Sequence, residues 1–138
     1  MRVSSSRRLL GTVAGLVAGF AVVFAVELAG ARLYPPPPGF DPKNPEAVKH
    51  LMATLPMGAF VLVILAYLAA SLVGALVATR VAHTALSGWV VGAVMLAATV
   101  ANLVAMPHPT WFAAACVGAV ILGTWMGGRM GRRIPTEA

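Results

Sequence analysis

Glu27 is the residue of this sequence best placed to do chemistry, because it is the only acid inside a long apolar segment. A carboxylate within the hydrocarbon layer of a membrane is costly, so such an acid is by default a candidate for proton or cation coupling. Glu27 lies about 10 Å along a helix from Tyr34, where its apolar segment ends. This shallow depth leaves a second interpretation open, a structural acid that is neutral or paired with Arg32, Asn102 or His108.

Further polar residues are expected near the same face of the membrane. Asn102 lies about one turn before the end of its own apolar segment, where a buried asparagine commonly bridges helices by hydrogen bonds. Imidazole and thioether groups could together bind Cu(I), and His50 and His108 have methionines nearby in the sequence. Because no MxxM or HxxxH spacing supports such a site, we expect no metal and no cofactor. The candidate polar cluster consists of Glu27, Arg32, Asn102, His108 and His50.

Patterns typical of enzymes are not found in the sequence. There is no P-loop and no serine, histidine and acid arrangement for nucleophilic catalysis. The single cysteine, Cys116, excludes a disulfide within the chain, a CxxC redox pair and a multi-thiolate zinc site. We therefore expect a protein that is not an enzyme, and we assign no catalytic residue.

The segments that carry these residues are too apolar for a soluble protein. The chain has 138 residues, of which 59% are hydrophobic and 10% charged, with a mean hydropathy of +0.87. Soluble domains carry about 25% charged residues, and disordered chains are less hydrophobic still. A membrane-spanning helix needs about 20 apolar residues. The sequence therefore predicts one all-α, polytopic membrane domain over 1–138, a bundle of four transmembrane helices at about 9–33, 57–79, 86–106 and 111–128.

The first two predicted spans are separated by a stretch, 34–56, that begins with four prolines. Proline removes a backbone donor, so this part is expected to be a stiff outer loop. Asn44, Pro45 and Glu46 then have the character of a helix start, leading into a short amphipathic helix. An alternative interpretation of 1–33 is a cleaved signal peptide, since an Arg-Arg pair precedes the apolar stretch and small residues end it.

Basic residues predict the orientation of the chain. Lysine and arginine are enriched in cytoplasmic loops. With the N-terminus inside, the cytoplasmic set is Arg2, Arg7, Arg8, Arg80, Arg129, Arg132 and Arg133, against Arg32, Lys43 and Lys49 on the other side. Both termini are therefore predicted to be cytoplasmic (N-in/C-in). These arginines flank spans and form no separate basic domain, so nucleic acid is not an expected partner.

Small residues recur every four positions in all four predicted spans. The rows are Gly11, Gly15 and Gly19; Ala66, Ala70, Gly74 and Ala78; Ala93, Ala97, Ala101 and Ala105; and Ala115, Ala119, Gly123, Gly127 and Gly131. Close packing of small residues drives helix association in lipid, and glycine otherwise weakens a helix. The glycine rows of the first and fourth spans therefore predict tight interfaces, within the bundle or between protomers. Glu27 continues the first row and is predicted to face a packed interface rather than lipid.

Two stretches resemble a family of small four-span bacterial inner-membrane proteins. They are Tyr34-Pro-Pro-Pro-Pro-Gly39 through Asp41-Pro42 and Pro45-Glu46 to Leu55-Pro56-Met57-Gly58-Ala59, and Pro107-His108-Pro109-Thr110-Trp111-Phe112. The resemblance implies a topology but no activity. Small multidrug exporters also carry a glutamate in their first helix, but theirs lies near the membrane centre and its flanking residues differ.

The function expected from the sequence is a structural or accessory role in the lipid bilayer. The protein would associate with itself as a homo-oligomer or with a membrane-protein partner. The alternative is a small oligomeric transporter or channel that uses Glu27 as its ion- or proton-coupling carboxylate.

Overall fold

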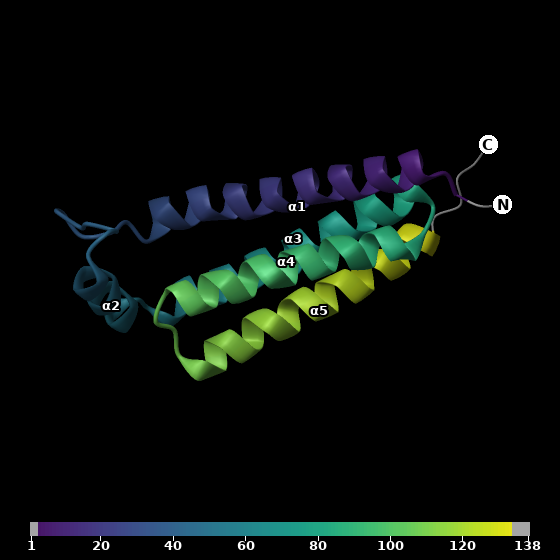
Figure 1. Cartoon of the computed structure of the whole chain (residues 1–138). Helices are drawn as coiled ribbons and strands as arrows, with labels where there is room; N and C mark the ends of the chain where they lie inside the picture. The colour runs from purple at the N-terminus through teal and green to yellow at the C-terminus, as the bar shows by residue number, and fades with distance from the viewer. Residues whose placement is uncertain (1–2, 134–138) are drawn as a thin grey trace.

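The computed structural model describes residues 3–133, and within this range it contains helices and no strand. The five helices are α1 (Ser5–Leu33), α2 (Pro45–Thr54), α3 (Met57–Ala82), α4 (Ala85–Ala105) and α5 (Thr110–Arg133) (Figure 1). All except α2 are long and apolar enough to cross a membrane. The prediction of an all-helical chain with four candidate spans is confirmed.

Helix α3 is the centre of the arrangement. It packs most extensively against α1 and α5, while α4 contacts α1, α3 and α5. The first turn of α1 and the last turn of α5 lie at one end of the molecule, which we name the terminal end (Figure 1). The Pro-rich loop and α2 lie at the opposite end, named the loop end (Figure 1).

Local sequence signals define the helix ends. Asn44 caps α2 by accepting a hydrogen bond from the backbone N–H of Glu46 at 3.1 Å, and Pro45 occupies the first turn, as their order in the sequence predicted. Helix α3 ends at Ala82, and the left-handed φ of 53° at the next residue, His83, reverses the chain into α4. Helix α5 continues to Arg133, beyond the predicted limit at 128, and Gly131 in this extension is buried against α3.

The glycines of α1 bring its backbone into contact with α3. Gly11, Gly15 and Gly19 are its buried residues. A Cβ atom built on Gly15 would lie 2.5 Å from the carbonyl oxygen of Gly74 and 2.7 Å from the Cβ of Ala78. Ordinary contact begins near 3.4 Å, so α1 approaches α3 more closely than any other residue would allow.

The glycines of α5 approach α3 in the same way. A Cβ on Gly127 would overlap the carbonyl oxygen of Leu72, and one on Gly131 would lie 2.8 Å from the Cβ of Thr79. Both glycine rows therefore make contacts within a single chain, which is one of the two arrangements that the sequence left open.

The alanine row of α4 lies on the opposite face from its packing residues. Ala93, Ala97, Ala101 and Ala105 are exposed. The buried face of α4 contains Gly88 and Gly92 instead, and a Cβ on Gly92 would overlap the side chain of Thr124. Alanine is equally compatible with lipid and with a helix contact, so its spacing alone does not identify the packed face.

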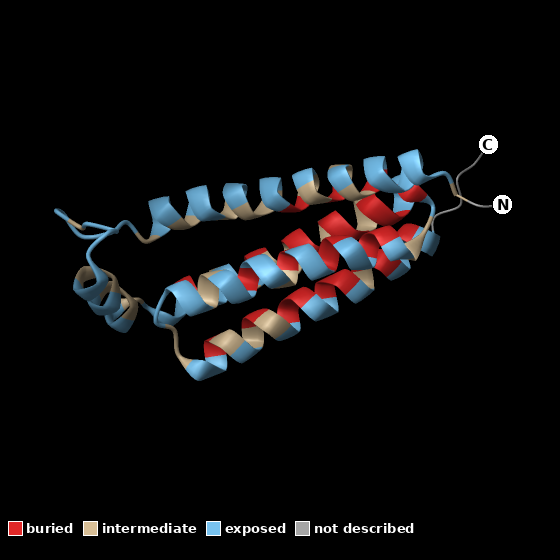
Figure 2. Ribbon diagram, viewed as in Figure 1, coloured by how far each residue is buried: buried red, intermediate tan, exposed pale blue. Residues whose placement is uncertain are grey.

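Burial is distributed unevenly along α1, as Figure 2 shows. No residue of α1 after Gly19 is buried, and the outward side chains are large and apolar. Leu9 and Val17 are each 66% exposed and Phe24 63%, which is an exterior suited to lipid. Helix α1 is therefore held firmly in its first half and less closely toward the loop end.

Candidate functional site

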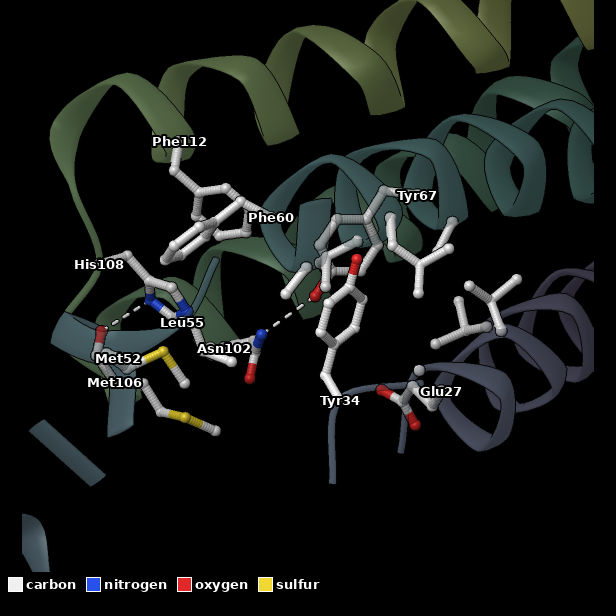
Figure 3. Close-up of a pocket in the computed structure, with 17 residues that line it drawn as sticks. Glu27, Tyr34, Met52, Leu55, Phe60, Tyr67, Asn102, Met106, His108 and Phe112 are labelled. Atoms are coloured by element: carbon white, nitrogen blue, oxygen red, sulfur yellow. Dashed lines mark hydrogen bonds between the residues drawn. The ribbon is translucent and has the colours of Figure 1, made fainter. Parts of the chain in front are cut away.

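A cavity of about 290 Å³ lies at the loop end, where α1 no longer packs closely on α3. Residues of all five helices and of the Pro-rich loop line it (Figure 3). Its walls are mainly aliphatic, with Val23 and Val26 from α1 and Leu62 and Val63 from α3. Polar side chains enter it from α1, α3 and α4. The cavity is the place where the described residues bring polar chemistry and enclosed space together.

Glu27 lines this cavity rather than a packed interface, so the prediction for its environment was wrong. Its side chain is exposed, whereas Gly11, Gly15 and Gly19 are buried. The reason is helix geometry: each step of four residues turns the chain by about 400°, so an i+4 row drifts by about 40° per step. Over the four steps from Gly11 to Glu27 the drift is about 160°, and Glu27 has left the glycine face.

Asn102 and Tyr67 connect two helices at the cavity wall. The Nδ2 of Asn102 donates a hydrogen bond of 3.0 Å to the hydroxyl oxygen of Tyr67, which joins α4 to α3. This is the bridging role that the position of Asn102 predicted. The carbonyl oxygen of the same amide is not used in this bond and stays available as an acceptor.

His108 is fixed beside the cavity by its own backbone environment. Its Nδ1 lies 2.9 Å from the carbonyl oxygen of Met106, and a carbonyl can only accept, so Nδ1 carries the proton. The imidazole stacks on Phe112, with ring centroids 5.1 Å apart and planes 20° apart. In the neutral ring Nε2 is then an acceptor.

Aromatic rings close the cavity toward α5. The ring of Phe60 packs edge to face against Phe112, with ring centroids 5.1 Å apart, and against Trp111, with centroids 5.8 Å apart. Phe60, Phe112 and Cys116 are all buried. This cluster gives the loop end a rigid apolar wall, since edge-to-face aromatic pairs have a preferred geometry.

The predicted polar cluster is brought together only in part. Glu27, Asn102 and His108 line the cavity, whereas Arg32 and His50 are exposed and lie outside its lining. Arg32 follows Glu27 by five residues, which places it about 140° around the helix from the carboxylate. His50 lies on the exposed side of α2.

Sequence reasoning missed several residues of the site. Tyr34 turns its ring into the cavity (Figure 3), and its hydroxyl is so close to Gly58 that a Cβ there would overlap it. Met52 and Met106, which are among the methionines that the sequence places near His50 and His108, also line the cavity. Gly58 could have signalled a close neighbour, but nothing in the sequence identified Tyr34 as that neighbour.

A second hollow adjoins the cavity between α1 and α4. Its lining includes Phe20 and Phe24 from α1 and Met95 from α4. Glu27 and Asn102 line both the cavity and this hollow.

Among the described residues, neither a group of potential metal ligands nor a matching relative indicates a function for this site. In the described range 3–133, no three His, Cys, Asp or Glu side chains are grouped as metal ligands would be. Comparisons of the sequence with models of protein families, with curated proteins and with solved structures found no match. The function is therefore inferred from the geometry of the chain itself.

Proposed function

We propose that this chain is a structural or accessory protein of a bacterial inner membrane, with four spans and a non-enzymatic role. It acts by assembling with itself or with a larger membrane complex. The observation that carries this proposal is that α1 and α5 both pack on α3 at backbone distance toward the terminal end, while the cavity and its adjoining hollow lie between the middle of the bundle and the loop end. Such an arrangement suits a closed scaffold better than a conduit through one chain.

The charges at the two ends support an orientation with both termini in the cytoplasm. Arginines at the start of α1, at the end of α3 and at the end of α5 belong to the terminal end. The loop end carries Arg32, Lys43 and Lys49 together with Asp41 and Glu46. Arg129 also stacks over Trp125 at 5.3 Å, an arrangement suited to the interface between lipid and water.

The surface for assembly is proposed to be the exposed alanine row of α4. Because the glycine faces are used within the chain, they do not serve an interface between chains. Ala93, Ala97 and Ala101 are small and exposed, so a second helix could approach them closely. In lipid, such close approach is a main source of association between helices.

The test is native mass spectrometry of the protein extracted gently from its own host's membranes. We expect a homo-oligomer or a co-purifying membrane complex that Ala97→Phe disrupts. Ala21→Phe is the matched control, because Ala21 is also exposed but lies on α1. A wild-type protein that is monomeric and without partners would refute the proposal. Equal assembly in wild type and both variants would refute the α4 surface.

A second candidate function is a small oligomeric transporter or channel that uses Glu27. The exposure of the Glu27 carboxylate to a cavity favours it. In proteoliposomes, Glu27→Gln should then abolish a pH-dependent flux and leave the oligomeric mass unchanged. A flux that Glu27→Gln leaves intact would refute this function.

A further inference from the structure

The carboxylate of Glu27 has no hydrogen-bond partner among the other residues that line its cavity (Figure 3). The cavity lining contains no lysine or arginine. A carboxylate among apolar groups is unfavourable unless a donor or an opposite charge compensates it. The cavity lining therefore contains a carboxyl group without a partner, and a bound cation could pair with it.

A second polar group of the cavity, the side-chain amide of Asn102, is also suited to a positively charged ligand. Asn102 uses its Nδ2 to bond the Tyr67 hydroxyl, which leaves its carbonyl oxygen, with its partial negative charge, available to a ligand. The rings of Tyr34 and Phe60 line the same space, and aromatic faces attract cations. Acceptors and aromatic rings together favour a cation over an anion.

The apolar walls do not suit Mg²⁺ or Ca²⁺ as the occupant. Mg²⁺ and Ca²⁺ need about six or more oxygen ligands, whereas Glu27 is the one carboxylate in the lining. Val23, Val26 and Leu62 instead offer contact to an apolar group. The volume of about 290 Å³ is near the lower end of the range for small-molecule pockets, about 300–1,000 Å³.

We infer that the cavity binds an organic ammonium ion that carries an apolar group. The ammonium lies between the Glu27 carboxylate and the Asn102 carbonyl oxygen, and the apolar group lies against α1 and α3. The adjoining hollow between α1 and α4, which contains Phe20 and Phe24, accommodates a longer apolar tail. This inference does not depend on the proposed assembly role, because all of its residues belong to one chain.

The first experiment varies only the charge of the ligand. Wild-type protein in dodecyl maltoside, a detergent without charge or ammonium, is titrated with benzyltrimethylammonium by isothermal calorimetry. Neopentylbenzene is its neutral counterpart, with carbon in place of the ammonium nitrogen. We expect benzyltrimethylammonium to bind saturably. We also expect that neopentylbenzene at an equal concentration does not displace it. Absence of saturable binding, or equal competition by the neutral compound, would overturn the inference.

The second experiment varies only the carboxylate. Glu27→Gln should weaken the cation by about tenfold or more, the usual effect of losing a charge-assisted contact. Glu46→Gln is the matched control, since Glu46 is an exposed acid on α2 outside the cavity, and it should bind like wild type. Equal affinity in wild type and Glu27→Gln would refute the inference. If Glu27→Gln does not fold, the comparison of the charged and neutral ligands on the wild-type protein still tests the inference.

A lipid amine and a small free ammonium compound share this chemistry. Phosphatidylethanolamine and phosphatidylglycerol are therefore each added to the wild-type titration. Competition by phosphatidylethanolamine alone identifies the natural ligand as a lipid headgroup. Competition by neither lipid, with binding of benzyltrimethylammonium intact, identifies it as a small ammonium compound.

Discussion

Gly15→Ala should loosen the bundle by forcing α1 away from α3. The new Cβ would lie 2.5 Å from the carbonyl oxygen of Gly74, and ordinary contact begins near 3.4 Å. The difference is about 0.9 Å, and the backbone must move to provide it, because the nearest atom is a carbonyl oxygen of α3. A gap of about 0.5–1 Å forfeits a quarter to a half of the dispersion energy of each contact that it opens.

The matched control for this change is Gly118→Ala. Gly118 is also inside an apolar helix, but a Cβ built on it meets nothing within 4 Å. Both variants gain the same helix propensity from alanine, so their difference isolates the helix contact. Overpacking typically costs about 1–3 kcal/mol, and we expect Gly15→Ala to be less stable than Gly118→Ala by about 2 kcal/mol.

Cys116 provides the assay. It is the one cysteine of the chain, and it is fully buried in α5. A thiol-reactive fluorophore therefore reports thermal unfolding in dodecyl maltoside without an added label site. Unfolding midpoints for Gly15→Ala equal to or above those for Gly118→Ala would show that α1 does not pack on α3 through this glycine.

Three further changes test other contacts of the structure. The Thr79 hydroxyl is buried without a hydrogen-bond partner among the described residues, so Thr79→Val should raise the stability of the fold by about 1 kcal/mol. Thr99→Val is the control: it removes the 2.8 Å hydrogen bond from the Thr99 hydroxyl to the Met95 carbonyl oxygen, so it should lower stability in the same thermal assay. Tyr67→Phe leaves the Asn102 amide without its hydrogen-bond acceptor and should lower the stability of the fold by about 1–3 kcal/mol. An unchanged unfolding midpoint would contradict the hydrogen-bonded bridge between α3 and α4. Asn44→Ala removes the N-cap of α2 and should destabilise this helix by about 1 kcal/mol. Hydrogen exchange of the backbone amides in the first turn of α2 should become faster, and an exchange rate equal to that of wild type would contradict the cap.

The fold was largely predictable because hydrophobicity and length alone identify helices that can cross a membrane. The faces on which these helices pack were less predictable. Ala97 and Gly92 both belong to regularly spaced small residues of α4, yet Gly92 is buried and Ala97 is exposed. Glycine is the better indicator because it weakens a helix, but Gly118, which contacts nothing, shows that even this indicator fails at single positions.

The site was less predictable than the fold. Glu27 was identified because an acid is rare in an apolar segment, but its surroundings were misjudged by extending an i+4 row too far. Tyr34 and Met52 reach the cavity through the loop and the short helix that follow α1, and their positions depend on how the chain returns to α3. That path is set by tertiary packing, which the spacing of residues in one helix does not encode.

The position of the cavity follows from how side-chain size changes along α3. Toward the terminal end α3 presents Gly74 and Ala78, which allow α1 to approach at backbone distance. Toward the loop end it presents Phe60 and Tyr67, whose rings keep the neighbouring helices farther apart. The same α1 helix rotates its glycine row away from α3 over this length. Separation and rotation together place Glu27 beside the cavity, so the exposure of the acid and the cavity itself have one structural cause.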